Sequence, residues 1–393
     1  MTVRTVVTIV LGSVLVLAPA LVEAQSPQPA TTPASAPAQA AVPVEESSFD
    51  RIWKTFTTWY DNPSNPMLQR VLFAGRFQQD FAAVNAEQGD HDEWNTRRFR
   101  VGHRLIFFRD FTLHGEAELN PQEAEPFYVR LTDMYGQWSN NARLVVTVGK
   151  HSIPFTMDGS TSSKDLIAID RSNLTNNIWF SQEYLPGASV SGKISHWTYR
   201  GGLYSAGATN REFGEFSGGA VALTSVGFDF GNRLGVSQAT LTGNYVHQNP
   251  DTDNTFTRQL EHILSVNFRV ETADWGLRTD VSTGDGYFEQ RDLWGVMAMP
   301  YYKISNKLQA VGRYTVVKSD GVNGVRLATY ENTVVPRGQG DRYQELYLGA
   351  NYYIYDHKLK LQTGLQFGDM NDRANDGGAY SGVSWTSGLR IGW

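Results

Sequence analysis

The sequence predicts an all-β fold, a transmembrane antiparallel β-barrel of about 16 strands. Three observations lead to this prediction. Segments of about ten residues alternate apolar with polar or small side chains from about Gln69 to the last residue. The connections between these segments are alternately short and long, and the chain begins with the pattern of an export signal.

The bulk composition excludes several other classes of protein. The chain has 393 residues, 41% of them hydrophobic, and a mean hydropathy of −0.36, which is too polar for a bundle of membrane helices. It has no cysteine, which excludes disulfides, zinc–thiolate sites and thiol nucleophiles. The net charge of −6 is unlike the basic excess of nucleic-acid-binding proteins.

Residues 1–24 form a predicted signal peptide. An arginine near the start precedes the apolar run 6–18, and Val22 and Ala24 are the small residues that a signal peptidase needs, so that Gln25 would begin the mature chain. The alternative is a single transmembrane anchor. That alternative needs about 20 apolar residues, and this run is shorter.

Three further regions follow the signal. Residues 25–45 are almost entirely Pro, Ala, Thr, Ser and Gln, which predicts a flexible linker. Residues 46–68 contain a short helix, roughly 49–60, with aromatic residues on one face, and a lead-in to the barrel. That helix could pack against the barrel mouth or a partner subunit, or lie on the surface without a specific role. The barrel itself is predicted over residues 69–393.

The last strand shows the alternation most clearly, because each face of a strand takes every second residue. One face carries Val383, Trp385, Ser387, Leu389, Ile391 and Trp393, and the other carries Ser384, Thr386, Gly388, Arg390 and Gly392.

The connections set the number of strands. Short turns are predicted at 109–110, 140–141, 195–196, 231–232, 272–274, 305–306 and 355–356. Long loops are predicted at 82–93, 120–126, 150–187, 205–219, 248–257, 283–291, 318–342 and 369–382. This alternation gives about sixteen strands with both termini on the short-turn side, as in bacterial outer-membrane barrels, whose periplasmic turns are short.

The size of the predicted barrel indicates which face of its strands meets lipid. Backbone groups in hydrocarbon must all be paired, so the sheet has to close. About sixteen strands enclose too much volume for side chains to fill, so the interior must hold water. The apolar faces then point outward into the bilayer.

Residues 97–172 resemble the phosphate-selective porin O and P family. The resemblance rests on Arg97-Arg98-Phe99-Arg100-Val101, Phe108-Arg109-Asp110-Phe111, Leu131-Thr132-Asp133-Met134-Tyr135, Val148-Gly149-Lys150, Pro154-Phe155, Thr161-Ser162-Ser163 and Asp170-Arg171-Ser172. It implies a sixteen-stranded channel of the outer membrane, assembled as a homotrimer, with an inward-folded third loop that narrows the lumen.

The composition of that loop also predicts that it folds inward. The connection 150–187 is the longest and carries several apolar side chains, which would be costly to expose to water. Folding against the inner wall would cover them. The alternative is an outward loop that makes contacts at the cell surface.

The predicted lumen wall carries more cations than acids. The cations are Arg76, Arg98, Arg100, Arg104, Lys193, Arg200, Arg269, Arg278, Arg313, Lys360 and Arg390, and the acids are Asp80, Glu116, Glu118, Glu261, Asp280 and Glu345. A pore lined by one sign of charge enriches the opposite ion. Arg97 and Arg98 are adjacent, and a regular strand cannot turn both toward the lumen, so one of them should meet the rim or a neighbouring subunit.

The candidate site combines the resemblance with this wall. We assign Arg98, Arg100, Arg104, Ser162, Ser163, Lys164 and Arg171 to anion contact at the constriction, and Asp133 and Asp170 to orienting a cation there. Alternatively, Arg171 could pair with Asp165 or Asp170 and only hold the shape of the loop. Residues 157–159 (Met-Asp-Gly) stand where phosphate-specific members carry a lysine, which favours a general anion preference.

The sequence thus predicts an outer-membrane porin for passive diffusion of small, mainly anionic solutes, phosphate or related oxyanions among them. The expected partners are outer-membrane lipid and two further copies of the chain, with no nucleic acid. No enzymatic activity, cofactor or metal site is expected, since the eight histidines show no paired metal spacing. The alternatives are a non-selective general porin, a barrel enzyme using His103 or His114, and a secreted soluble β-protein.

Overall fold

The computed structural model describes residues 47–179, 184–206, 212–213, 219–252, 254 and 258–393. The predicted signal peptide and linker lie outside these residues. The chain divides into two compact units, 1–52 and 53–393. The described part of the first unit is only the beginning of helix α2 (Ser48–Thr57), which corresponds to the helix predicted for this region. No helix in the described part of the chain is long and apolar enough to cross a bilayer.

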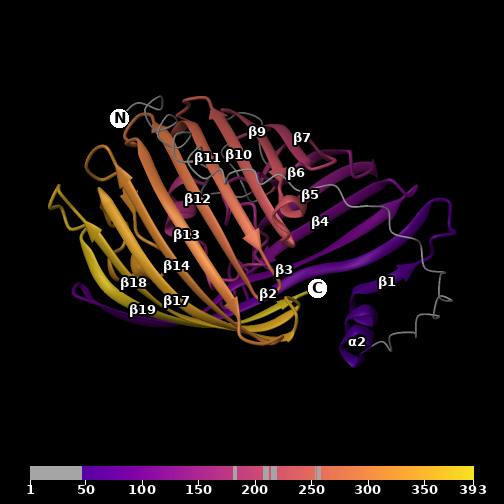
Figure 1. The fold of residues 1–393 in the computed structure, drawn as a ribbon, viewed down its shortest axis with the longest axis horizontal. Helices are drawn as coiled ribbons and strands as arrows, with labels where there is room; N and C mark the ends of the chain where they lie inside the picture. The colour runs from indigo at the N-terminus through magenta and orange to yellow at the C-terminus, as the bar shows by residue number, and fades with distance from the viewer. Residues whose placement is uncertain (1–46, 180–183, 207–211, 214–218, 253, 255–257) are drawn as a thin grey trace, which may run out of the picture. The chain divides into compact units, whose positions relative to one another are not determined.

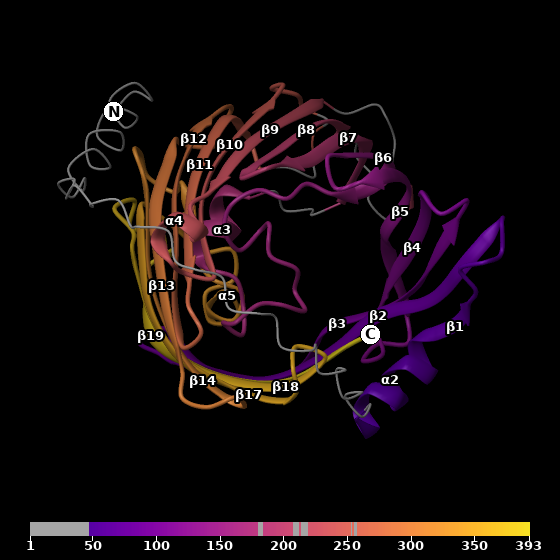
Figure 2. The ribbon, with the colours of Figure 1, turned by 45° about the vertical axis from the view of Figure 1, so that its right-hand side comes forward.

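The second unit is a closed antiparallel barrel (Figures 1 and 2). Seventeen described strands form one sheet, of which sixteen make the ring. Each of the sixteen pairs with the next along the chain, and β19 pairs with β2 to close the ring, Ser387 opposite Phe81. The sixteen are β2 (Leu68–Ala86), β3 (Gly89–Phe107), β4 (Phe111–Leu119), β5 (Tyr128–Asn141), β6 (Leu144–Ser152), β7 (Tyr184–Ile194), β8 (Trp197–Ser205), β9 (Ala220–Asp229), β10 (Gln238–Gln248), β11 (Leu260–Glu271), β12 (Trp275–Gly286), β13 (Leu293–Lys303), β14 (Leu308–Ser319), β17 (Arg342–Tyr355), β18 (Leu359–Asn371) and β19 (Tyr380–Gly392).

The seventeenth strand, β1 (Thr58–Asp61), extends the sheet at the seam. It pairs with the start of β2, where Thr58 lies opposite Leu72. The pairing of β19 with β2 ends at Arg76, so this part of β2 lies beyond the end of β19. The indole of Trp53 donates a hydrogen bond to the Gly392 carbonyl over 2.9 Å. Phe56 packs edge-on against Phe73, with ring centroids 5.3 Å apart. Residues 53–61 therefore cover the end of the strand pair that closes the barrel.

Most connections fall where the sequence predicts them, with two exceptions. The predicted loop 82–93 is strand: β2 and β3 are 19 residues long each and join at residues 87–88. At this hairpin end β3 carries polar residues on both faces (90–93) and β2 carries mainly small residues (82–86), so that the apolar alternation of a bilayer strand does not reveal it. The predicted tight turn at 231–232 is instead a longer connection that contains the short helix α4 (Gly231–Leu234).

The two faces of the wall differ as the alternation predicts. On β18, Leu361, Leu365 and Phe367 are exposed on the outer face, whereas Lys360 and Gln362 are buried on the inner face.

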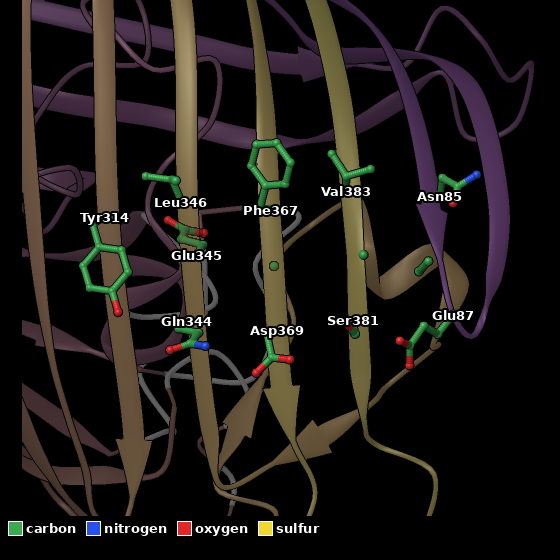
Figure 3. Close-up of a pocket in the computed structure, with 13 residues that line it drawn as sticks. Asn85, Glu87, Tyr314, Gln344, Glu345, Leu346, Phe367, Asp369, Ser381 and Val383 are labelled. Carbon is green, nitrogen blue, oxygen red and sulfur yellow. The ribbon is translucent and has the colours of Figure 1, made fainter.

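Figure 3 shows the edge of the outer apolar band on the side of the long loops. Tyr314, Leu346, Phe367 and Val383 form a row across four strands, and a row of polar side chains lies next to it toward the loops. That polar row is Gln344, Asp369, Ser381 and Glu87. The change from apolar to polar side chains marks the boundary expected between hydrocarbon and headgroups.

Two long connections run inside the ring. Loop three, the connection from β6 to β7, is described over 153–179 and contains helix α3 (Asn173–Ile178). Loop seven, residues 320–341, contains β15 (Val325–Arg326), α5 (Glu331–Val334) and β16 (Gln339–Gly340). Figure 2 shows α3 and α5 within the circle of strands. Their apolar side chains form an internal core, which includes Ile153, Phe155, Leu174, Ile178 and Val325.

A charge placed on the outer face tests this orientation. Leu348 lies at the middle of β17 and is 51% exposed, so Leu348→Arg would put a guanidinium into hydrocarbon. We expect it to lower the free energy of unfolding by about 2–4 kcal/mol, against about 0–1 kcal/mol for Gln344→Arg in the polar row of the same strand. Urea titration of barrels refolded into vesicles measures both variants. Equal losses would contradict the assignment of the lipid-facing band.

Candidate pore constriction

Loop three is held against the wall by the strands at the end of the chain. The carbonyl groups of Leu166, Ile167, Ile169 and Asp170 each accept a hydrogen bond from an inward side chain. Lys360 donates to Leu166 over 2.6 Å, Asn351 to Ile167 over 2.7 Å, Arg390 to Ile169 over 3.2 Å and Arg313 to Asp170 over 2.7 Å. These contacts satisfy backbone groups that would otherwise be buried without partners.

Buried ion pairs hold two of these donors in place. Arg313 lies 2.9 Å from Glu345, and their side chains are 1% and 0% exposed. Arg390 pairs with Asp80 in the same way. Three inward cations of the wall, Arg313, Arg390 and Lys360, therefore anchor the loop.

Arg171 stabilises loop three from within. Its Nε donates to the Asp158 carbonyl over 3.0 Å, and its guanidinium lies 4.9 Å from the centre of the Trp179 ring. The Asp158 carboxylate accepts a hydrogen bond from the Ser172 amide over 2.8 Å, and Ser172 in turn caps α3. Arg171 is 6% exposed. This geometry favours the alternative in which Arg171 holds the loop's shape, and the described hydrogen bonds of its guanidinium include those to the carbonyl groups of Asp158 and Thr161.

Asp170 joins loop three to the wall and to loop seven. Its carboxylate lies 3.2 Å from the Arg97 guanidinium and accepts a hydrogen bond from the Thr329 hydroxyl over 2.9 Å. Burial disfavours the charge of Asp170, but the positive charges of Arg97 and Arg98 outweigh it and hold the pKa of Asp170 below its ordinary value. Asp170 is therefore a structural carboxylate shared by three segments.

The contact of Arg97 corrects one expectation. Register shifts at this point of the β2–β3 pair, where Gln78 faces Arg98 and Gln79 faces Thr96, so Arg97 is the extra residue of a bulge. Arg98 donates to Gln78 over 3.0 Å while Arg97 reaches Asp170. Both adjacent arginines thus contact the interior, and neither is left to the rim or to a neighbouring subunit.

The arginines of β2 and β3 are largely neutralised by acids. Arg76 lies 3.1 Å from Glu116, and Arg100 lies 3.2 Å from Glu118 and donates to the Tyr184 hydroxyl over 2.6 Å.

Two of the remaining predicted site residues, Ser163 and Lys164, also have protein partners near β2. The Ser163 hydroxyl accepts a hydrogen bond from Arg76 over 2.6 Å, and Lys164 donates to the Trp393 carbonyl over 2.6 Å. Arg104 is exposed and lies opposite His114 in the strand register, and Asp133 lies opposite Glu116 on the same inner face.

The open space lies on the other side of the ring. A cavity of about 930 Å³ separates loop three from strands β7 to β12. Loop three contributes Pro154, Met157, Ser160, Thr161, Ser162 and Asp165. The strands contribute the cations Lys193, Arg200, Arg269 and Arg278, together with neutral residues such as Ser225, Thr240, Thr242, Asn244 and Asn267. Asp165 is the one acidic residue among the described residues that line it.

The four cations of the cavity wall differ in how they are paired. Arg269 and Arg278 share Glu271, at 2.7 Å and 3.2 Å. The side chains of Lys193 and Arg200 have no hydrogen-bond or ion-pair partner among the described residues. Strand register gives the reason for Arg200, since it lies between Ser191 and Ser225, whereas Arg100 lies opposite Glu118. Arg200 and Lys193 are therefore available to a solute in the cavity.

Of the nine residues assigned to the constriction from the sequence, the structure places Ser162 on the cavity. The other eight line the charge-paired side, loop three itself or its attachments. The sequence analysis found the four wall cations as lumen residues but did not assign them to the site. A signal was present: counting back from the turn at 195–196 puts Ser191 opposite Arg200, with no acid beside it.

The two histidines considered for a catalytic site lie on opposite faces of the wall. His103 packs against Trp59 and Phe73 on the outer face. His114 lies on the inner face, buried beside Tyr135. They share no site.

Fold and cavity together define an outer-membrane channel. A family model described as phosphate-selective porin O and P matches residues 71–282, and the chain belongs to this family. No curated protein matches the chain.

Solved structures of outer-membrane proteins share the fold. An anion-selective porin from Comamonas acidovorans is 12% identical, with a TM-score of 0.58 over 82% of this chain and 99% of that one. OprB of Pseudomonas putida is 12% identical, with a TM-score of 0.60 over 82% and 94%. The channel DcaP of Acinetobacter baumannii is 13% identical, with a TM-score of 0.55 over 85% and 100%. At these identities the likeness shows the fold alone.

Glu331 on α5 is a buried acid that helps to hold loop seven in the lumen. Its carboxylate accepts hydrogen bonds from the Tyr343 hydroxyl over 2.8 Å and from the Gln366 amide over 3.0 Å. It is 1% exposed. Burial raises the pKa of Glu331 to about 7, so its neutral form is favoured in the folded state.

This raised pKa predicts a pH dependence. Because the folded state binds the proton of Glu331 more tightly than the unfolded state, stability should fall as the pH rises from about 4.5 to about 7, by on the order of 3 kcal/mol in total. We expect Glu331→Gln to remove this decline. Urea titrations of the wild type and the variant across that range measure it. Glu289→Gln, at an exposed loop position, is the matched control, and a decline that persists in Glu331→Gln would contradict the assignment.

Proposed function

We propose that the chain is a passive porin whose water-filled cavity favours small anions over cations. The observation that carries the proposal is the set of four wall cations, Lys193, Arg200, Arg269 and Arg278, facing loop three across the cavity with Asp165 as the acidic residue among the described lining. Arg200 and Lys193 keep their charge free for a solute, since no described residue pairs with their side chains.

The physical basis is the local excess of positive charge. A narrow aqueous space between protein walls of low dielectric concentrates the potential of the charges that line it. Guanidinium groups add a forked donor that matches oxyanions, and the hydroxyls of Ser160, Thr161 and Ser162 lie on the facing side of the cavity. Phosphate and related oxyanions are therefore among the expected solutes. That one structural neighbour is an anion-selective porin agrees with this proposal.

The residues before Thr161 favour a general anion preference over a phosphate-specific one. Asp158 stands in the segment where phosphate-specific members carry a lysine, and its carboxylate is buried against the Ser172 amide. This position therefore contributes an acid to loop shape rather than a cation to the cavity.

Reversal potentials in asymmetric KCl test the preference. A unit charge about 6 Å from a passing ion in water is worth about 0.7 kcal/mol, or about threefold in the permeability of one ion, and it acts in opposite directions on chloride and potassium. We expect the wild type to prefer chloride, Arg200→Gln to reduce the chloride-to-potassium ratio about tenfold, because both effects are lost together, and Arg200→Lys to retain it.

Arg373→Gln provides the matched control, because it removes one charge from an exposed residue that does not line the cavity. It should leave the ratio unchanged. A wild type without charge preference would make the chain a general porin, and cation selectivity would refute the assigned role of the wall.

Export and assembly belong to the same proposal. Cleavage after Ala24, as the small residues Val22 and Ala24 predict, would make Gln25 the first mature residue, and the resemblance to the family implies a homotrimer in the outer membrane. Native mass spectrometry of protein extracted from outer membranes measures both properties at once. We expect three chains, each lacking residues 1–24; a monomer, or chains that keep the first 24 residues, would contradict the corresponding part.

A further inference from the structure

Two histidines meet on the outer face of the barrel at the end that carries the long loops. His247 of β10 and His262 of β11 are direct partners in the strand register. Their rings lie nearly parallel, with centroids 5.0 Å apart and planes inclined by 24°. Their neighbours Val246 and Ile263 are fully buried on the inner face, which places both imidazoles outside.

A carboxylate joins the pair. Leu260 lies opposite Gly286 and His262 opposite Asp285, so Glu261 is the extra residue of a bulge. Its carboxylate lies 3.7 Å from Nε2 of His262. One ligand atom from each of His247, Glu261 and His262 lies within 4.8 Å of the other two.

The ring nitrogens are suitably disposed for a metal ion. Nδ1 of His262 lies 2.8 Å from the Tyr245 hydroxyl, which can accept a hydrogen bond from the protonated Nδ1 and so leave the lone pair of Nε2 for a metal ion. Nδ1 of His247 is buried without a hydrogen-bond partner among the described residues. The unpartnered Nδ1 of His247 and the Tyr245 hydroxyl that can orient the His262 ring are two separate observations that favour a bound ligand here.

We propose that His247, Glu261 and His262 bind a Zn²⁺ ion at the extracellular rim, independently of the channel's solute preference. Two imidazoles and one carboxylate, with water in the fourth position, are a common zinc ligand set. Tetrahedral bonds of about 2.0–2.1 Å require ligand atoms roughly 3.3 Å apart, somewhat closer than found here. The side chains of His262 and Glu261 are 44% and 38% exposed, so small rotations can close the difference.

A bound ion would tie β10 to β11 next to the loop that joins them. The sequence analysis expected no metal site because 14 residues separate the two histidines and no short motif links them. Only the register of the two strands brings them together.

Titration of tag-free, detergent-folded protein with Zn²⁺ tests the proposal, with Co²⁺ as a spectroscopic probe of the ligands. We expect one ion per chain. His247→Ala and His262→Ala should each lower the affinity about 100-fold or more, and Tyr245→Phe, which removes only the outer-shell hydroxyl, about 10-fold.

His91→Ala is the matched control, because His91 lies 3.5 Å from Glu93 on an exposed part of β3 and is not part of the His247–His262 cluster. It should leave binding unchanged. Heat-modifiable migration on a gel confirms that each variant still forms the barrel. Absence of stoichiometric binding by the wild type, or equal losses in His91→Ala and His262→Ala, would overturn the proposal.

Discussion

Closure of the sheet is the constraint on which the rest of this structure depends. In hydrocarbon no water can form hydrogen bonds with a backbone amide, so the first and last strands of the sheet must pair with each other. Here β19 pairs with β2 along most of its length. Closing sixteen strands fixes a ring too wide for wall side chains to fill. The chain fills part of that space with its own loops three and seven and leaves the remainder as a cavity between loop three and β7 to β12.

The inner wall uses the same residue type for two purposes, and the partner within reach decides which. Arg313 and Arg390 each pair with a buried carboxylate and donate a hydrogen bond to a loop-three carbonyl. Their charge is therefore neutralised, and they hold the loop rather than contact a solute. Arg200 lies between two serines in the register and keeps its charge available. Counting lumen cations therefore overstates the charge that a solute meets. The positions of the inward-facing acids determine which part of the inner wall keeps a net positive charge.

The sequence could predict the direction of a side chain wherever the strand keeps its regular period of two residues. Alternation in the last strand gives the inward position of Arg390 and the outward position of Trp385, because a period of two fixes both faces. A bulge breaks that period, and nothing in the local residues shows it, so the inward turn of both Arg97 and Arg98 could not be foreseen. The cavity was missed for another reason. Its position depends on where loop three settles across the ring, and that is decided by carbonyl contacts with Lys360, Asn351, Arg390 and Arg313, more than 140 residues away in the chain.

These anchors also separate selectivity from stability. Loop three is bound on one side by buried charges whose loss would leave an unpaired ion in the protein, a change that costs several kcal/mol. On the opposite wall, β12 also contacts the loop, because the Asp280 carboxylate accepts a hydrogen bond from the Met157 amide over 2.6 Å, but Arg200 and Lys193 have no described partner. Substitutions of Arg200 and Lys193 can alter the charge that a solute meets without disturbing the loop or the strand pairing. A barrel built in this way can change its solute preference at residues such as Lys193 of β7 and Arg200 of β8, while the buried contacts of the other residues hold loop three in place.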